Sequence, residues 1–404
     1  MVASTPATPP VDAILWPLDE AVTVWHTAGE DPLDLTYCFE TQAPTDRGWG
    51  NTRNFTALSP ADRAVIRTAL AAYAEVANLR FTEIGVGGAD ADLSFGRVAL
   101  GYGGYGQFYY NYRTSGGAVS TRELDGLAVF DLDRSLSGFS GLYLALHEIG
   151  HALTLKHSGD YDVAGGTAPG PFLPTATDSS KFTVMSYNEN PDTHRMDGAL
   201  GPFDIAAIQY RFGANLATRA GNSTYSLPEG GRRTIWDAGG VDTFQFGTAT
   251  ARLRIDLRPG RYSSAGGTDN LAIAYGCIIE KAYGGAGDDT IQGNTVANTL
   301  RGGAGNDTLV GSGGNDSLVG GTGNDLAAFF GARSRYTIKR LSPSVYQISG
   351  PAGTGTDTLS GVERVKFGAS APISITALAA SRTLAATRVA RTVPDAVKGL
   401  LAAS

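Results

Sequence analysis

A nine-residue repeat constrains the fold of this chain more than any other feature. The pattern G-G-x-G-x-D-x-U-x, where U is a large apolar residue, starts at Gly284, Gly293, Gly302, Gly311 and Gly320. Its sixth position reads Asp289, Asn298, Asp307, Asp316 and Asp325, and its eighth reads Ile291, Leu300, Leu309, Leu318 and Ala327. A fixed period of nine predicts a parallel β-roll, in which short strands point apolar residues into a thin core. A flexible glycine-rich linker is the alternative that composition favours, but register across the repeats argues against it.

The same repeats predict calcium sites. Ca²⁺ takes six or more oxygen ligands, so two turns on the same side of the roll, 18 residues apart, must share each ion. Glycines allow turns with positive φ and bring carbonyl groups close to the aspartates. The expected ligands are Gly285, Gly287, Asp289, Gly303, Gly305, Asp307, Gly321, Gly323 and Asp325, with Gly314 and Asp316 in a second row. That second row is weaker because Asn298 carries an amide in place of a carboxylate.

A second motif lies upstream, in residues 146–157, which hold three of the five histidines. His147 and His151 are four residues apart, so in a helix both present a ring nitrogen to one metal ion. Glu148 lies beside the pair and can take a proton from water that attacks a carbonyl. His157 is the expected third ligand of a tetrahedral catalytic zinc site, and the helix must then end before it. The alternative is three ordinary histidines on an amphipathic helix.

This motif, HExxHxxxxxH, resembles that of the metzincin zinc proteases, and Val184-Met185-Ser186-Tyr187 resembles their Met-turn. From about residue 58 to about residue 326 the chain is similar to the serralysins, secreted bacterial zinc endopeptidases with a calcium-binding tail. The resemblance implies that Met185 is an apolar floor below the histidines. It also implies that Tyr187 can ligate the resting metal and then hydrogen-bond the oxyanion. A tyrosine packed in a turn is the plainer alternative.

One position departs from the family pattern. Metzincins have glycine where this chain has Thr154, at the turn that delivers the third histidine. Glycine reaches positive φ without steric cost, whereas a β-branched residue there is an outlier. Either Thr154 is held in a strained conformation or the turn is remodelled so that threonine keeps negative φ.

The resemblance implies further ligands and partners. Family calcium ligands match Arg219, Gly221, Ser223, Asp237, Gly239, Asp242 and Glu280, with Ser223 where threonine is usual. The expected cofactors are one catalytic Zn²⁺ and several structural Ca²⁺. The expected partners are protein or peptide substrates, a one-step (type I) secretion machinery that reads an uncleaved C-terminal signal, and a small protein inhibitor. We expect a secreted, extracellular monomer.

Length, composition and charge limit the number of domains and the kinds of partner that the chain can have. At 404 residues, with 42% apolar residues, the chain predicts two domains, and its net charge of −7 argues against nucleic acid as a partner. The sequence contains no run of 18 apolar residues, so no transmembrane helix is predicted. The N-terminus lacks the basic and apolar regions of a secretory signal peptide. Cys38 and Cys277 are expected to be buried thiols, although Cys38 could instead block the zinc in a zymogen.

The expected fold is an α+β metzincin catalytic domain followed by an all-β parallel β-roll domain. We expect an N-terminal arm or short pro-segment over residues 1–30, the catalytic domain over 31–213, and the roll and secretion domain over 214–404, with nonapeptides at 284–328. Ser59 should cap a helix that runs to about residue 78, and a closing helix should span about 204–212. Strands are predicted at 35–39, 80–84, 93–98, 127–131, 336–339, 345–349 and 356–363.

The function that these patterns predict is a secreted zinc-dependent endopeptidase stabilised by calcium. The alternative is a catalytically weak, calcium-dependent adhesion or surface-layer protein on a protease fold.

Overall fold

The computed structural model of the protein describes residues 8–17, 31–43, 54–85, 91–115, 118–161, 170–228 and 231–378, without the side chains of 110–115 and 118–123. The predicted N-terminal arm is therefore described only over residues 8–17. The chain divides into two compact units. The first unit comprises Met1–Ser223, Pro228–Gly240 and Pro259–Ile278, and the second, the roll unit, comprises Thr224–Leu227, Val241–Arg258 and Ile279–Ser404. The domain boundary expected at residue 213 stays a prediction.

The first helix, α1 (Pro60–Val76), begins where the sequence predicts. The hydroxyl of Ser59 accepts the Asp62 N–H at 3.1 Å, and the Asp62 carboxylate accepts the Ser59 N–H in return at 3.3 Å. This reciprocal cap satisfies backbone donors that a helix start leaves open. The predicted apolar face is buried, and the Tyr73 hydroxyl donates to the Leu146 carbonyl at 2.8 Å, which ties α1 to the next helix.

A five-stranded sheet in the order β2-β1-β3-β5-β4 forms the centre of the first unit. Its members are β1 (Leu33–Phe39), β2 (Leu79–Glu83), β3 (Leu93–Val98), β4 (Gly104–Ser115) and β5 (Ala118–Asp131). The first three and β5 pair in parallel, and β4 pairs antiparallel with β5 at the edge. The predicted strands fall within β1, β2, β3 and β5, apart from one residue at the end of β2, but β4 and the first half of β5 were not predicted.

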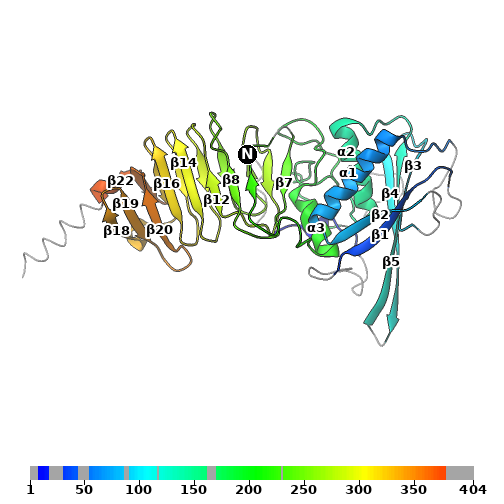
Figure 1. Ribbon diagram of the computed structural model, residues 1–404, viewed down its shortest axis with the longest axis horizontal. Coiled ribbons are helices and arrows are strands. Elements are labelled where there is room, and N and C mark those ends of the chain that lie inside the picture. The colour runs from blue at the N-terminus through cyan, green and yellow to red at the C-terminus, as the bar shows by residue number, and fades with distance from the viewer. Residues whose placement is uncertain are drawn as a thin grey trace, which may run out of the picture. The chain divides into compact units, whose positions relative to one another are not determined.

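The missed strand β4 begins with two glycines in three residues, Gly104 and Gly106, which weaken the strand pattern at its start. The structure gives the reason for one of these glycines. A Cβ atom at Gly106 would lie 2.2 Å from the Glu148 carbonyl oxygen and 2.7 Å from the His151 Cβ. The backbone of β4 therefore lies directly on helix α2 (Gly138–Ala152), which also packs against α1 (Figure 1).

Three smaller elements complete the first unit. Helix α3 (Pro202–Phe212) has Asp204 in its first turn, where the carboxylate accepts the Gly201 N–H at 2.8 Å. Strands β7 (Arg233–Ile235), β10 (Tyr262–Ser263) and β11 (Leu271–Ile273) form a small sheet. A short 3-10 helix, η1 (Val11–Ala13), contacts α3.

The roll unit consists of two sheets whose strands stack along the roll (Figure 1). One sheet has the order β18 (Thr337–Ser342), β19 (Val345–Ser349), β20 (Thr356–Ser360), β16 (Ser317–Thr322), β14 (Thr299–Ala304), β12 (Lys281–Tyr283), β8 (Thr243–Gln245) and β6 (Thr224–Tyr225). The other has the order β22 (Ile373–Ser374), β21 (Arg364–Phe367), β17 (Leu326–Phe329), β15 (Thr308–Val310), β13 (Thr290–Gln292) and β9 (Arg254–Asp256).

The nonapeptide register places alternate repeats in the two sheets. Ile291 pairs with Leu309 in one sheet and Leu300 pairs with Leu318 in the other. All five eighth-position residues have no exposed surface, so they form the thin apolar core that the repeat predicts. The β-roll is confirmed and the flexible linker is wrong. Of the described helices, none combines the length and the apolar character needed to cross a membrane.

We predict that Gly106→Ala loosens the contact between β4 and α2. The new methyl group would meet a backbone carbonyl, which cannot rotate away, so the strand must shift. Overpacking of this kind typically lowers the free energy of unfolding by about 1–3 kcal/mol. Urea unfolding at fixed calcium concentration measures it. Gly85→Ala is the matched control, because a Cβ there meets no atom within 4 Å, and equal losses in the two variants would contradict the contact.

Candidate active site

Three imidazoles converge at the end of α2. The Nε2 atoms of His147 and His151 lie 3.1 Å apart, and those of His147 and His157 lie 3.3 Å apart. The His151 and His157 Nε2 atoms are separated by 3.1 Å. Ligands 2.0–2.1 Å from a tetrahedral Zn²⁺ are separated by about 3.3–3.4 Å, so the three nitrogens fit this ion with only small adjustments.

Hydrogen bonds assign the tautomers of two of these rings. The Nδ1 of His147 lies 2.7 Å from the Val184 carbonyl oxygen, and the Nδ1 of His151 lies 2.9 Å from that of Leu155. A carbonyl oxygen only accepts, so each Nδ1 carries the proton and each Nε2 presents a lone pair. Two lone pairs that face each other at 3.1 Å repel unless a cation lies between them. The donor chemistry therefore fits a metal ion.

Burial keeps the rings neutral. It lowers the pKa of His147 well below its ordinary value and lowers the pKa of His151 to about 4. Burial and the neighbouring His151 lower the pKa of His157 to about 3. Burial thus favours neutral imidazoles, whose lone pairs are available to a metal.

Glu148 lies on the next position of α2 and is 4% exposed. Burial raises its pKa to about 8, and the Gly106 N–H bound to its carboxylate opposes this effect. A Cβ at Gly104 would lie 2.6 Å from the Glu148 Oε1, so strand β4 forms one wall around the carboxyl group. Such a group can accept and return protons near neutral pH.

Met185 and Tyr187 approach the histidines from a loop that precedes α3. Met185 is fully buried, and a Cβ at Gly150 would meet its Sδ at 2.8 Å, so the thioether lies beneath α2. Tyr187 is 47% exposed, and its ring centroid lies 4.6 Å from that of His157. Within the described residues its hydroxyl makes no hydrogen bond, which leaves it free to move.

The loop with Met185 is held by a residue that sequence reasoning missed. Asp204 is fully buried and accepts hydrogen bonds from the Val184 N–H at 2.8 Å and the Thr183 hydroxyl at 2.6 Å. Val184 in turn accepts the bond from His147. Burial raises the pKa of Asp204 to about 7, although these donors lower it. In the sequence Asp204 lies at the start of a predicted helix, and nothing at that position indicates a bond to Thr183 or Val184.

Of the two conformations considered for Thr154, the structure has the strained one, with positive φ. Its φ is +74°, and the Leu155 N–H donates to the Gly150 carbonyl while the Thr154 N–H donates to that of His151. This is the Schellman pattern of a helix C-terminus, whose left-handed position usually holds glycine. The Thr154 side chain is fully buried, and its hydroxyl finds no hydrogen-bond partner in the described part of the chain. The alternative prediction, a remodelled turn in which threonine keeps negative φ, is wrong.

The predicted calcium ligands of the roll unit form two rows of buried carboxylates. In one row the Asp289 N–H donates to Asp307, the Asp307 N–H to Asp325 and the Asp325 N–H to Glu363, each at 2.8 Å. In the other row the Asn298 N–H donates to Asp316 at 2.8 Å and the Asp316 N–H to Asp357 at 3.0 Å. Glu280 and Asp242 extend this row, since the Asp242 N–H donates to Glu280 at 2.7 Å.

In these rows several carboxylate oxygens have no hydrogen-bond donor among the described residues. The Oδ2 atoms of Asp307, Asp316 and Asp325 are buried and, among the described residues, accept no hydrogen bond. Burial raises the pKa of Asp307 and of Asp316 to about 6. Buried carboxylate oxygens without donors are costly unless a cation binds them, and hard oxygen ligands suit Ca²⁺. The glycines of successive turns also lie next to one another, because a Cβ at Gly303 would lie 2.1 Å from the Gly285 carbonyl oxygen.

Asp357 and Glu363 were missed because they lie beyond the repeats. The spacing is 41 residues from Asp316 to Asp357 and 38 from Asp325 to Glu363, in place of 18. The hairpin of β18 and β19 interrupts the roll before the first of them. The stretch Gly353-Thr354-Gly355-Thr356-Asp357-Thr358-Leu359 keeps the G-x-G-x-D-x-U pattern, which is the signal that could have found it.

In the first unit the other calcium candidates lie in two loops that touch. A Cβ at Gly240 would lie 2.6 Å from the Gly221 carbonyl carbon, and the Ala238 N–H donates to the Thr218 carbonyl. Arg219, Gly221 and Ser223 lie on the first loop, and Asp237 and Gly239 on the second. Arg219 also donates to the Trp236 carbonyl at 3.0 Å.

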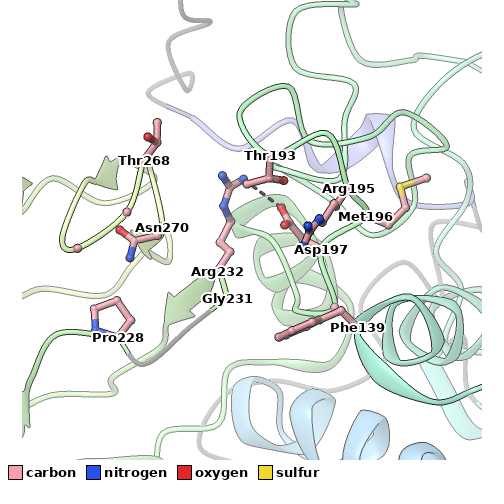
Figure 2. Close-up of a pocket in the computed structure, with 13 residues that line it drawn as sticks. Phe139, Thr193, Arg195, Met196, Asp197, Pro228, Gly231, Arg232, Thr268 and Asn270 are labelled. Carbon is pink, nitrogen blue, oxygen red and sulfur yellow. Dashed lines mark ion pairs between the residues drawn. The ribbon is translucent and has the colours of Figure 1, made fainter.

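A cavity of about 430 Å³ in the first unit does not hold this chemistry (Figure 2). Its described lining includes Phe139, Asp197 and Arg232 but none of the three histidines and not Glu148. Arg232 pairs with Asp197 at 3.1 Å and with Asp192 at 3.3 Å, so its charge is compensated. The reactive groups therefore lie at the end of α2.

Comparisons with known proteins agree with this geometry. Residues 49–164 match the family model described as Matrixin, and residues 232–348 match the one described as Peptidase M10 serralysin C terminal. The chain is 34% identical over 303 residues to Metalloprotease AprA of Pseudomonas entomophila (strain L48), covering 68% of this chain and 62% of that protein. It is 36% identical over 306 residues to Metallopeptidase AprA of Pseudomonas marginalis, covering 67% and 62%.

A third relative, Serralysin of Proteus mirabilis, is 34% identical over 304 residues, which cover 66% of this chain and 60% of that protein. The chain thus spans less than two thirds of the length of these curated relatives. Of the two family matches, the first includes the three histidines and the second includes the nonapeptides.

We predict that Thr154→Gly stabilises the protein. Threonine at positive φ costs on the order of 1–3 kcal/mol, and the buried hydroxyl adds to this. Glycine removes both costs and adds unfolded-state entropy of about 0.5–1 kcal/mol, so the net gain should be about 1 kcal/mol. Thermal unfolding measures it. Thr154→Ala is the matched control, because it removes the hydroxyl and keeps the backbone strain; a lower melting temperature for Thr154→Gly would show that φ is not strained.

Proposed function

The chain belongs to the M10 peptidases, with a serralysin-type C-terminal region, and from this premise we propose that it is a zinc-dependent endopeptidase that hydrolyses peptide bonds in proteins. The observation that carries the proposal is the convergence of three neutral imidazoles whose lone pairs need a cation. A base and a tyrosine accompany them. This complete set argues against a weak adhesion or surface-layer protein, which would need none of these groups.

His147, His151 and His157 would hold Zn²⁺ through their Nε2 atoms. When bound there, the ion supplies Lewis-acid chemistry to a scissile carbonyl. The chain's own contribution is to fix the ring orientations. The Val184 and Leu155 carbonyls hold two of the rings in the tautomer that ligates, and such outer bonds raise the affinity for metal.

Glu148 would move the proton. Its carboxylate takes a proton from the attacking water and passes it to the leaving amine, since both steps need a group that ionises near neutral pH. The Gly106 N–H and the wall formed by Gly104 keep the carboxyl group in one place.

Tyr187 would stabilise the oxyanion. Burial and the nearby Glu148 raise its pKa to about 12, so the phenol keeps its proton and can donate it in a hydrogen bond. Its ring centroid lies 4.6 Å from that of His157 and 4.7 Å from that of Tyr161, so the side chain lies beside the histidines. Tyr187 could also ligate the resting metal.

We further propose that the carboxylate rows bind several Ca²⁺ ions and that the protein acts outside the cell. Unpaired buried carboxylates hinder folding when calcium is scarce, as in the cytosol, and calcium outside then stabilises the roll by mass action. One-step (type I) secretion suits such a chain. Protein substrates and a small protein inhibitor are the partners that this reading expects.

We predict that Glu148→Gln keeps zinc and loses turnover. The residue is not a proposed ligand, and removal of a general base typically costs about 10²–10⁴-fold in rate. Casein hydrolysis by the zinc-loaded variant measures it, with metal analysis as the control. His157→Ala should instead lose affinity for zinc. Full activity of zinc-loaded Glu148→Gln would contradict the proposed mechanism.

We also predict that calcium stabilises the full chain through Asp307, which lies between two other carboxylates of its row. Asp307→Asn should reduce the rise in melting temperature between chelator and millimolar calcium, because an amide is a weaker ligand than a carboxylate. Asp133→Asn is the matched control, since Asp133 is an exposed carboxylate in the first unit, away from both rows. The same calcium response in both variants would remove Asp307 from the site.

A further inference from the structure

The described part of the N-terminal segment packs against the turn that delivers His157. We name residues 11–16 the N-terminal strap. Within it Ala13 is 4% exposed, Ile14 is 0% exposed and Leu15 is 5% exposed. This burial is unusual for a segment with only one short turn of helix, because terminal segments are poorly ordered unless they are tied down.

Three hydrogen bonds tie the strap to the turn, and a fourth joins the turn to Pro171. The Lys156 N–H donates to the Ile14 carbonyl at 2.6 Å, and the Trp16 N–H donates to the Thr154 carbonyl at 3.1 Å. Together they form an antiparallel bridge between Leu15 and Leu155. The Lys156 ammonium donates to the Ala13 carbonyl at 3.0 Å and to the Pro171 carbonyl at 2.8 Å.

Lys156 depends on these carbonyls. Its residue is 0% exposed, and within the described residues its ammonium has no carboxylate partner. Loss of a hydrogen bond to a buried cation is costly, so removal of the strap would weaken the hold on Lys156, which the Pro171 carbonyl and the Phe172 ring share. The residue next to it in the chain is His157.

The turn at Thr154 is strained and needs contacts from outside the turn to keep its conformation. Thr154 is at φ +74°, which a threonine rarely adopts, and its buried hydroxyl has no partner among the described residues. The strap bonds to the two residues that flank Leu155, one of which is Thr154 itself. A free turn would relax toward negative φ, and the direction of the chain toward His157 would change with it.

We propose that the N-terminal strap is a positioning element for His157, which selects the turn conformation that delivers the third imidazole. The metal site is then complete only while the strap is docked, and removal or displacement of the strap releases the metal. The inference deepens the proposed function, on which its meaning for catalysis rests, but the quantity that it concerns is metal affinity.

A purely structural role would give a different result. If the strap only anchors the N-terminal segment, its loss lowers stability without any special link to Thr154. If it holds the strained turn, glycine at position 154 should replace most of its effect, because glycine adopts this φ unaided. The coupling between strap and residue 154 therefore separates the two roles.

The experiment is a double-mutant cycle on zinc affinity. Metal-free full-length protein, a deletion of residues 1–16, Thr154→Gly and the combination are titrated with Zn²⁺ against a chromophoric chelator at fixed calcium concentration. The deletion should weaken zinc binding by about 10–100-fold in the Thr154 protein, as loss of outer-shell support typically does, and by less than about threefold with Thr154→Gly. Deletion of residues 1–9, which keeps the strap, is the matched control.

Equal losses in the two backgrounds, or no loss in either, would overturn the proposal. If the deletion does not fold, Trp16→Pro in the full chain removes the N–H that bonds to Thr154, and Trp16→Phe is its control. The same coupling to Thr154→Gly is expected there at smaller size, and its absence would again overturn the inference.

Activity assays separate this result from the proposed function. If the zinc cycle shows coupling but the full chain does not hydrolyse casein, the strap inference stands and the endopeptidase proposal fails. If the full chain hydrolyses casein and zinc affinity is indifferent to the strap, the reverse holds. His157→Ala sets the upper limit, because loss of the strap cannot weaken binding more than loss of the ligand itself.

Discussion

Two backbone carbonyls decide what the three histidines can do. Val184 and Leu155 each accept an Nδ1 proton, which forces both Nε2 lone pairs toward one point. The Val184 carbonyl is in place because Asp204 holds the N–H of the same residue. The metal chemistry of α2 thus depends on a carboxylate in the first turn of α3, and the burial that keeps the imidazoles neutral also raises the pKa of that carboxyl to about 7.

The roll unit follows the opposite logic. In each row a backbone N–H donates to one oxygen of the next carboxylate and leaves the second oxygen of several of them without a donor. The backbone bonds set the register, and the unpaired oxygens make that register unfavourable until a cation binds. A roll built this way couples folding to calcium concentration, because binding free energy and folding free energy are then the same quantity.

Local patterns in the sequence predicted well what depends on neighbours in the chain. The Ser59 cap, the HExxH face and the nine-residue register need only short-range spacing, and the structure bears out that cap, the convergence of the three histidines and the register. The missed features depend on contacts between distant segments. Strand β4 needs Gly104 and Gly106 where it touches α2, and Asp204 and Asp357 act across 20 and 41 residues. For β4 and Asp204 no spacing rule carries such information, since tertiary packing decides it, whereas Asp357 keeps the G-x-G-x-D-x-U pattern at an interrupted spacing.

The turn at Thr154 illustrates how magnitude decides whether strain can persist. A threonine at φ +74° costs on the order of 1–3 kcal/mol. Full burial of an isoleucine or leucine side chain contributes about 1.5–3 kcal/mol each, as an upper estimate. Ile14 and Leu15 are both buried beside this turn, so docking of their segment can offset the strain with a margin. Without that segment the hold on the turn is reduced to the helix cap and the bond from the His151 Nδ1 to the Leu155 carbonyl. The strained residue and the buried N-terminal segment are therefore best understood as one structural unit.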